Sequence, residues 1–200
     1  MSRPSVLPRA IGCVVFAVGL GVFAIRLRHA GPYALPTGGH LFGGVACLGL
    51  GAALVAREWP RVVSGLLIGL TAFALFPALF AIAAESEEVV VLHATDRDGQ
   101  PAALRLWIVD REDGAWLGMA RSKAVAHGLD GEPHRLLRDG DEICVVPRVV
   151  DDRAVARAVH AHKIEKYRVA QVTSRIGLYP SEAPDTSVAV RADACASENP

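Results

Sequence analysis

The sequence predicts an α+β protein, in which a bundle of membrane-spanning helices precedes an antiparallel β-barrel or half-barrel with two helices. Residues 1–84 carry six arginines, one glutamate and no lysine, whereas residues 85–200 carry 15 Lys/Arg and 20 Asp/Glu. Twelve of the 19 glycines also lie in the first 84 residues. Beyond residue 85 the apolar residues alternate with the period of two that is typical of strands.

The zero net charge is therefore the sum of a +5 region and a −5 region. So sharp a break indicates two regions in different solvents. It excludes a single soluble globule, an intrinsically disordered chain and a nucleic-acid binder with a broad positive field. We expect the lipid bilayer to be the partner of the first region, and we expect no nucleic-acid partner.

Three apolar runs predict transmembrane helices over residues 10–27, 39–56 and 62–84, because about 20 apolar residues span the roughly 30 Å hydrocarbon core. The first run also resembles a signal peptide. However, two arginines follow it and no small-x-small pattern precedes them, so a retained helix is favoured over cleavage.

Within the bundle, two GxxxG spacings occur, Gly39/Gly43 and Gly65/Gly69. They either let helix backbones approach closely or reflect the abundance of glycine in membrane helices. Pro77 is expected to kink the third helix, because its ring removes a backbone hydrogen bond. No acid or lysine lies within a run, so we interpret the bundle as an anchor rather than a transport path.

The positive-inside rule leans only slightly toward an inside N-terminus, which would export the C-terminal domain. On the side of the N-terminus, four arginines flank the predicted helices: Arg3, Arg9, Arg57 and Arg61. On the opposite side there are three: Arg26, Arg28 and Arg97.

Residues 85–192 are predicted to form the barrel, and residues 193–200 a loose tail. Asp-Gly and related turns separate the strands, and about 110 residues are enough for one core. The predicted strands cover residues 89–95, 102–110, 115–120, 134–138, 142–150 and 186–191. The predicted helices cover residues 121–131 and the segment from an Asp151-Asp152 cap to about Tyr167.

Five stretches in this order carry a resemblance to known proteins: residues 93–101 (HATDRDGQP), 106–110 (LWIVD), 121–123 (RSK), 129–140 (LDGEPHRLLRDG) and 165–167 (EKY). They span about residues 88–192. Their order and spacing resemble the split β-barrel flavoproteins, that is, the pyridoxamine-phosphate-oxidase-like proteins and the deazaflavin-dependent nitroreductase/quinone-reductase group. The resemblance implies a split barrel whose groove, often at a homodimer interface, holds FMN or a deazaflavin coenzyme.

The resemblance also implies that the cofactor phosphate meets Arg121, Ser122 and Lys123. A phosphate favours a helix N-terminus together with a cation, and these residues begin a predicted helix. The alternative is that Ser122 only caps the helix and Lys123 is solvated. Thr95 is a candidate for hydrogen bonding to the isoalloxazine ring.

Arg105 and Trp107 share a predicted strand face, which lines the groove or faces outward near a dimer partner. The acids Asp96 and Asp98 stand where many deazaflavin members have a basic phosphate loop. Acids repel a polyanionic tail, which disfavours the deazaflavin coenzyme and leaves open that no cofactor is bound.

Cysteines and histidines give weaker signals. Cys13, Cys47, Cys144 and Cys195 show no CxxC spacing, so neither a zinc site nor a redox pair is predicted, and unpaired cysteines are typical of a reducing compartment. No metal site is predicted. Haem binding occurs on the resembled fold, so the minor candidates for haem ligands are His93, His127 and His134. Two other histidines, His160 and His162, are predicted to be surface residues.

We therefore expect a membrane-anchored flavin- or deazaflavin-dependent oxidoreductase that reduces a small or lipid-soluble acceptor, such as a quinone or nitro compound. The cofactor would supply the hydride chemistry, and no catalytic side chain is assigned. The alternatives are a non-enzymatic membrane protein with a degenerate split-barrel binding or dimerisation module, and a haem-binding barrel. Because the family's cofactors are cytosolic, the expected location is a bacterial inner or plasma membrane with the C-terminal domain in the cytoplasm.

Overall fold

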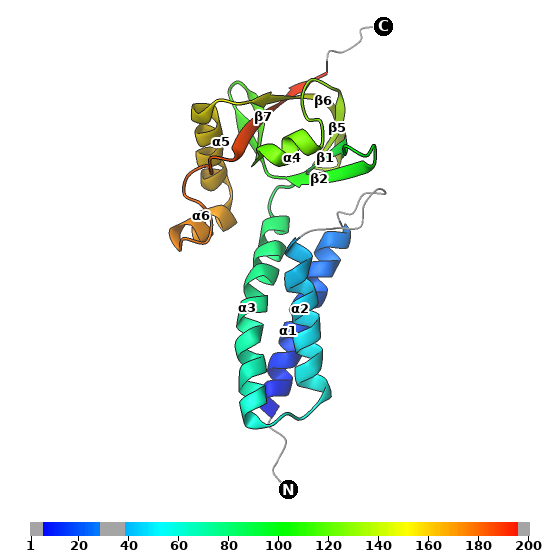
Figure 1. The fold of residues 1–200 in the computed structure, drawn as a ribbon, viewed down its shortest axis with the longest axis vertical. Helices are drawn as coiled ribbons and strands as arrows, with labels where there is room; N and C mark the ends of the chain where they lie inside the picture. Colours follow the sequence, from blue (N-terminus) through cyan, green and yellow to red (C-terminus); the bar gives the residue numbers. More distant parts are fainter. Residues whose placement is uncertain (1–5, 29–38, 196–200) are drawn as a thin grey trace. The chain divides into compact units, whose positions relative to one another are not determined.

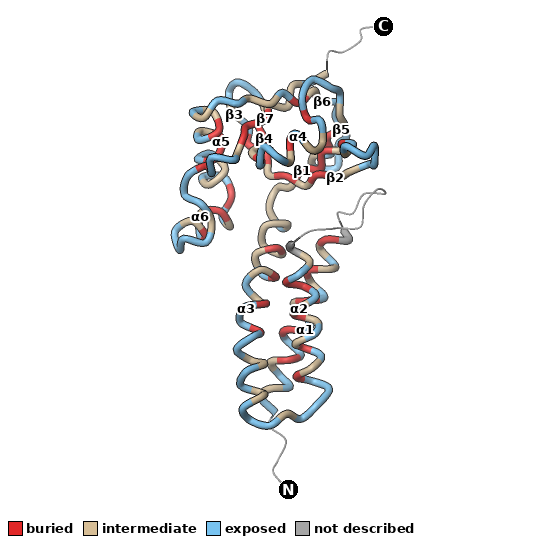
Figure 2. The backbone as a smooth tube through the Cα atoms, in the orientation of Figure 1, coloured by how far each residue is buried: buried red, intermediate tan, exposed pale blue. Residues whose placement is uncertain are grey.

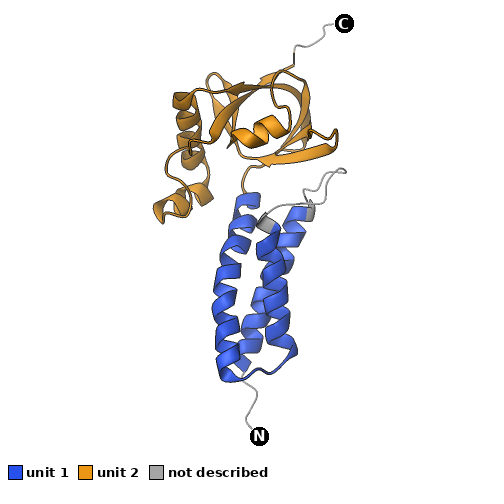
Figure 3. Ribbon diagram, viewed as in Figure 1, with its two compact units in different colours: residues 1–86 blue, residues 87–200 orange. Residues whose placement is uncertain are grey.

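The computed structural model describes residues 6–28 and 39–195, and Figure 1 shows its ribbon. The chain divides into two compact units, residues 1–86 and 87–200, which Figure 3 colours separately. The first unit contains three helices, α1 (Val6–Arg28), α2 (Gly39–Ala56) and α3 (Arg61–Ser86). Residues 29–38, between α1 and α2, lie outside the described residues.

Many residues of the three helices are exposed (pale blue in Figure 2), and large apolar residues are among them. Phe42 is 72% exposed, and Val62 and Phe73 are each 83% exposed. Two helices are long and apolar enough to cross a membrane, Val6–Arg26 and Arg61–Ser86, and α2 is a shorter apolar helix. The described part of the bundle thus holds two candidate spans by length and composition, where the sequence predicted three.

Glycines permit close contacts within this unit. A Cβ added to Gly51 would lie 2.6 Å from the backbone nitrogen of Phe16, and one added to Gly43 would lie 2.7 Å from that of Ala78. By contrast, nothing in the described chain lies within 4 Å of a Cβ added at Gly65 or Gly69. The second predicted GxxxG spacing therefore makes no helix contact here, whereas Gly43 of the first one does.

Within residues 87–195, the second unit contains seven strands and three helices. All seven strands pair antiparallel in one sheet, in the order β2-β1-β5-β6-β7-β4-β3. The predicted α+β class, with helices preceding an antiparallel half-barrel, is confirmed. The half-barrel has three helices where the sequence predicted two, and α6 is the one not predicted. The elements are β1 (Val90–Thr95), β2 (Pro101–Leu106), β3 (Ile108–Arg111), β4 (Gly114–Ala120), α4 (Arg121–Ala126), β5 (His134–Arg138), β6 (Asp141–Val150), α5 (Arg153–Lys166), α6 (Arg168–Arg175) and β7 (Ser187–Ala194).

The strand order itself requires the sheet to curl. β2 and β3 are its two opposite edges, yet only Trp107 separates them along the chain. The edges must therefore approach each other at Trp107, and this approach forms the seam of a half-barrel. The single strand predicted over residues 102–110 is wrong at this point, because the chain leaves one edge and joins the other.

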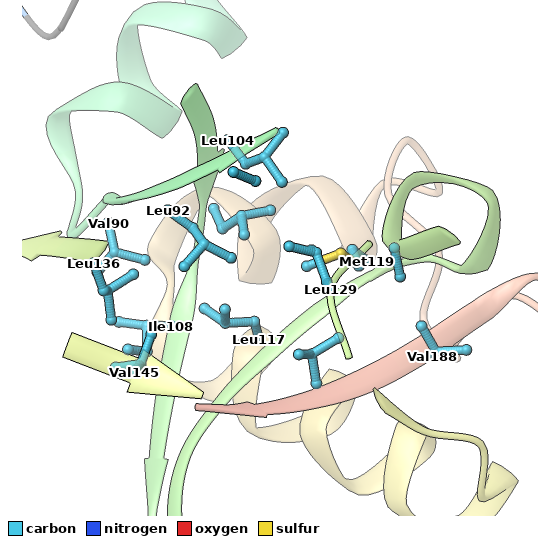
Figure 4. Packing of buried hydrophobic residues seen from close by; sticks show 14 residues of the cluster. Val90, Leu92, Leu104, Ile108, Leu117, Met119, Leu129, Leu136, Val145 and Val188 are labelled. Carbon is cyan, nitrogen blue, oxygen red and sulfur yellow. The ribbon is translucent and has the colours of Figure 1, made fainter. Parts of the chain in front are cut away.

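One apolar core fills the inside of the curl (Figure 4). Leu104, Leu106 and Ile108 all face it, as their alternation in the sequence predicted, and Ile108 is fully buried. Its other members come from most of the remaining elements, including Val90, Leu92, Leu117, Met119, Leu129, Leu136, Val145 and Val188.

Two turns explain where neighbouring elements end. Asp139 and Gly140 have φ of 52° and 95°, so they form the two-residue turn with left-handed geometry that joins β5 to β6. α4 ends at Ala126, earlier than the predicted residue 131, because Gly128 and Gly131 take φ of 58° and 85°, outside the helical region.

Cys144 of β6 and Cys195, directly after β7, form a disulfide whose Cα atoms lie 5.4 Å apart. The register that pairs Val145 with Ala194 brings the two cysteines opposite each other. The prediction that no cysteines pair is therefore wrong for these two. β7 also extends to Ala194, so the disulfide and the sheet hold the first residues of the segment predicted to be a loose tail.

Candidate functional site

A groove of about 510 Å³ opens beside the first turn of α4. It lies among the turn after β1, α4 and the residues before β7. The predicted site residues Arg121 and Ser122 line it. The full lining is Arg97, Arg121, Ser122, Val125, Ala126, Asp185 and Thr186.

Arg97 reaches the groove from a turn that Asp96 stabilises. The Asp96 carboxylate accepts hydrogen bonds from the backbone nitrogens of Asp98 and Gln100, at 2.9 and 2.8 Å. This acid therefore holds the turn together, and the turn places a cation, Arg97, in the groove lining. Arg97 has no ion-pair partner among the described residues. Arg97 was not among the site residues predicted from the sequence, because Asp96 and Asp98 on either side of it indicated an acidic turn.

Arg121 is the second cation of the groove, and both of its terminal nitrogens donate to the Asp151 carboxylate. These hydrogen bonds raise the pKa of Arg121 and lower the pKa of Asp151. Both side chains are exposed, so an incoming anion competes with Asp151 in high dielectric, where such pairs are weak.

The start of α4 differs from the predicted phosphate-binding helix terminus. The first amide, that of Arg121, donates to the Thr186 carbonyl at 2.7 Å. Ala120 occupies the N-cap position, so Ser122 is not the cap and lies within the first turn. An anion here would therefore be held by side chains, not by the Arg121 amide.

The other four predicted residues do not line the groove. Thr95 ends β1 opposite Pro101, and Arg105 lies in β2 opposite Val91. Trp107 lies at the seam, where its ring stacks on Tyr167 with 4.6 Å between ring centroids. Lys123 lies in α4. Burial of His127 is the main cause that lowers the pKa of this histidine, and the charge of Lys123 lowers it further.

The donor set of the groove fits a phosphate. Two guanidinium groups and the hydroxyls of Ser122 and Thr186 supply the charge-assisted and neutral hydrogen bonds that phosphate oxygens accept. Val125 and Ala126 supply an apolar wall, and 510 Å³ falls within the roughly 300–1,000 Å³ of small-molecule pockets. Asp185, the one acid in the lining, forms an ion pair with Arg153.

Of the histidines, His134 has the most distinctive surroundings. Its Nδ1 lies 3.1 Å from the His93 carbonyl oxygen, so Nδ1 donates this hydrogen bond. Nε2 is buried without a hydrogen-bond partner. The described residues contain no group of three His, Cys, Asp or Glu side chains that could hold a metal ion. His162 is exposed as predicted, but His160 is buried.

Neither a protein-family model nor a curated protein matches the chain. Several solved structures are similar over part of it, and three of them follow. HutZ, the heme storage protein of Vibrio cholerae, is 14% identical with a TM-score of 0.41, and the match covers 54% of this chain and 82% of HutZ. A conserved hypothetical protein of Mycobacterium tuberculosis is 19% identical, with a TM-score of 0.38 and coverage of 60% and 80%. A putative pyridoxamine 5′-phosphate oxidase of Listeria innocua is 13% identical, with a TM-score of 0.37 and coverage of 55% and 86%.

The strand order and the seam define the class of the C-terminal unit. It is a curled, seven-stranded antiparallel half-barrel, the architecture that the resemblance to the split-barrel flavoproteins implied.

Proposed function

We propose that the chain is a membrane-anchored protein whose half-barrel binds the phosphate of a flavin-type cofactor in the groove beside α4 and reduces a small acceptor. The observation that carries the proposal is the convergence of Arg97, Arg121, Ser122 and Thr186 on one groove. When bound, the cofactor supplies the hydride chemistry. The side chains hold and orient its phosphate, and Val125 contacts its apolar part.

The helical unit supports the anchor. Its outward apolar side chains would be solvated by lipid, whereas a water-soluble bundle would bury them. An anchor keeps the groove close to substrates dissolved in the membrane, which favours a quinone or another lipid-soluble acceptor.

The disulfide supports placing the half-barrel outside the cytoplasm, on the side opposite to the one expected from the cofactor. Disulfides persist in oxidising compartments and are rare in the cytosol. The small excess of arginines beside the N-terminus and the loop after α2 favours the same orientation, if all three helices cross the bilayer.

Binding of FMN to the full chain in mild detergent tests the proposed function. Arg97→Gln and Arg121→Gln should each weaken binding by about tenfold or more, because a hydrogen bond to a charged group contributes roughly 1.5–3 kcal/mol. Asp151→Asn should tighten binding, because it releases Arg121. Arg157→Gln, an exposed arginine on α5, is the matched control. No binding of FMN, or equal effects of the control, would refute the proposal.

The buried, unpartnered Nε2 of His134 favours haem as a second candidate. A histidine whose Nδ1 donates to a carbonyl is oriented to coordinate a metal through Nε2. Haem titration should then give a Soret band that His134→Ala abolishes and His162→Ala leaves unchanged. A band that persists in His134→Ala would eliminate this candidate.

A further inference from the structure

A second cavity, of about 160 Å³, lies between α5, β4 and the loop that precedes β7. It is separate from the groove beside α4 and shares no lining residue with it. Its described lining contains one lysine, Lys163, one histidine, His160, and no acid. The remaining walls are mostly small and apolar, including Ala156, Ala183 and Val188.

Helix α5 directs Lys163 onto the sheet. Val159, one turn earlier, is 1% exposed and packs with Trp116 and Ala189, so this face of the helix is the buried one. The amine reaches Gly118 of β4, where an added Cβ would lie 3.0 Å from Nζ. Gly118 has an ordinary φ, so the lack of a side chain there serves to make room for the amine.

The amine lacks a charged partner. Its one hydrogen bond is to the Gly118 carbonyl at 3.3 Å, and no carboxylate pairs with it in the described chain. Lys166, three residues later, lies 2.6 Å from Glu88 and 3.3 Å from Asp110. An ammonium has three donors, so most of the hydrogen-bonding capacity of Lys163 remains unused.

The charge of the cavity at neutral pH follows from its titratable groups. Burial lowers the pKa of Lys163 to about 8, so the amine is still mostly protonated at pH 7. Burial also lowers the pKa of His160, and Lys163 acts in the same direction, so the imidazole is neutral. Burial raises the pKa of Tyr179, which therefore stays a neutral phenol. β4 and β7 contribute no ionisable group to the lining.

The cavity thus holds one half-buried positive charge without a counter-charge among the described residues, although charges withdrawn from water in proteins are normally paired. Its outer wall is held in place: Arg153 donates to the carbonyls of Ala183 and Pro184, at 2.8 and 2.7 Å.

We propose that this cavity binds a small carboxylate anion, whose oxygens accept hydrogen bonds from Lys163 and whose short apolar tail packs against Ala156, Ala183 and Val188. The volume is below the roughly 300 Å³ of ordinary small-molecule pockets, which limits the ligand to about four or five carbons. This site does not depend on the proposed cofactor groove.

Isobutyrate is a suitable probe, and its neutral analogue isobutyramide is the control ligand. The chain contains only three lysines, Lys123, Lys163 and Lys166, so side-chain ¹⁵N labelling of lysine gives three assignable NMR signals. Adding isobutyrate to the full chain in detergent should shift the Lys163 signal saturably and raise its pKa above about 8. The other two signals should not move. An equal response to isobutyramide, or no saturable shift, would overturn the proposal.

Variants test the same point by calorimetry. Lys163→Met should weaken isobutyrate binding by about tenfold or more, the loss expected for a charge-assisted hydrogen bond. Gly118→Ala should also weaken it, because the new methyl group displaces the amine. Arg157→Met removes a charge from the exposed face of the same helix and should have no effect. Unchanged binding in folded Lys163→Met would refute the site. If that variant does not fold, the NMR titration of the unmodified chain decides.

Discussion

At the scale of single residues, the hydroxyl of Tyr167 closes the seam of the half-barrel. The side chain is 1% exposed. Its hydroxyl donates to the Ile108 carbonyl at 2.7 Å and accepts from the Ile108 amide at 2.9 Å. It therefore satisfies both backbone groups of the first residue after the break at Trp107.

Tyr167→Phe should lower the free energy of unfolding by about 1–3 kcal/mol, because it leaves the buried Ile108 amide without an acceptor. Tyr179→Phe is the control, since the Tyr179 hydroxyl has no hydrogen bond in the described chain. Urea unfolding of the full chain in mild detergent measures both variants. Equal losses would show that the hydroxyl of Tyr167 does not hold the seam.

Asp110 lies beside the same seam and forms a charged cluster with Arg138, Lys166 and Glu88. Arg138 donates to both of its carboxylate oxygens, at 2.6 and 2.7 Å. These hydrogen bonds are the main cause that lowers the pKa of Asp110 to about 2. The cluster is partly exposed, so solvent screening reduces its contribution to stability.

The lowered pKa predicts an acid dependence of stability. Because the folded pKa is below the unfolded value of 3.8, the contribution of Asp110 is present above about pH 4 and is lost as the pH falls toward 2. Asp110→Asn should cost about 1 kcal/mol at pH 7 and flatten this dependence. Asp141→Asn, at an exposed acid that forms no ion pair with any described residue, should do neither. An unchanged acid profile in Asp110→Asn would contradict the assignment.

At the scale of elements, local sequence determined most boundaries. The Asp152 side chain accepts from the Ala154 amide at 2.7 Å and caps α5, as the paired aspartates predicted. α6 was not predicted, because it is only eight residues long and follows α5 after Tyr167 alone.

Asp152→Ala should lower the free energy of unfolding by about 1 kcal/mol, the usual loss on removing a helix N-cap. Asp152→Ser should retain most of the stability, because a serine hydroxyl also caps. Thermal unfolding of the full chain measures both. Equal stability of the alanine variant and the unmodified chain would show that this cap contributes nothing.

At the scale of the whole molecule, the Cys144–Cys195 disulfide closes a loop of 51 residues. In the chain-entropy treatment a loop of this length stabilises the fold by roughly 4 kcal/mol, and measured effects are often smaller. The double variant Cys144→Ser/Cys195→Ser should lower the unfolding midpoint, and reducing agent should affect only the unmodified chain.

The disulfide also predicts the compartment of the half-barrel. A phosphatase reporter fused after Pro200 should be active outside the cytoplasm, and the two cysteines should resist alkylation in cells until reductant is added. If the fused phosphatase is inactive and both cysteines are alkylated without reductant, the half-barrel lies in the cytoplasm instead.

The candidate site was only partly predictable. Arg121 and Ser122 line the groove, because the start of α4 is marked in the sequence by residue type. Arg97 and Thr186 reach the groove from segments almost 90 residues apart, and no local pattern relates them. The alternation of apolar residues placed Trp107 inside a continuous strand. In the structure it lies at the seam, because the chain changes there from one edge of the sheet to the other.

The sequence by itself determined the two regions of opposite charge, the apolar helices, the alternating strands and the Asp-Gly turns. Each depends on composition or on residues a few positions apart. Only the tertiary structure decided the meeting of β2 and β3, the pairing of Cys144 with Cys195, and the contact of the Lys163 amine with Gly118. These depend on the strand register and the packing of α5, which join residues distant in sequence through backbone hydrogen bonds and apolar burial.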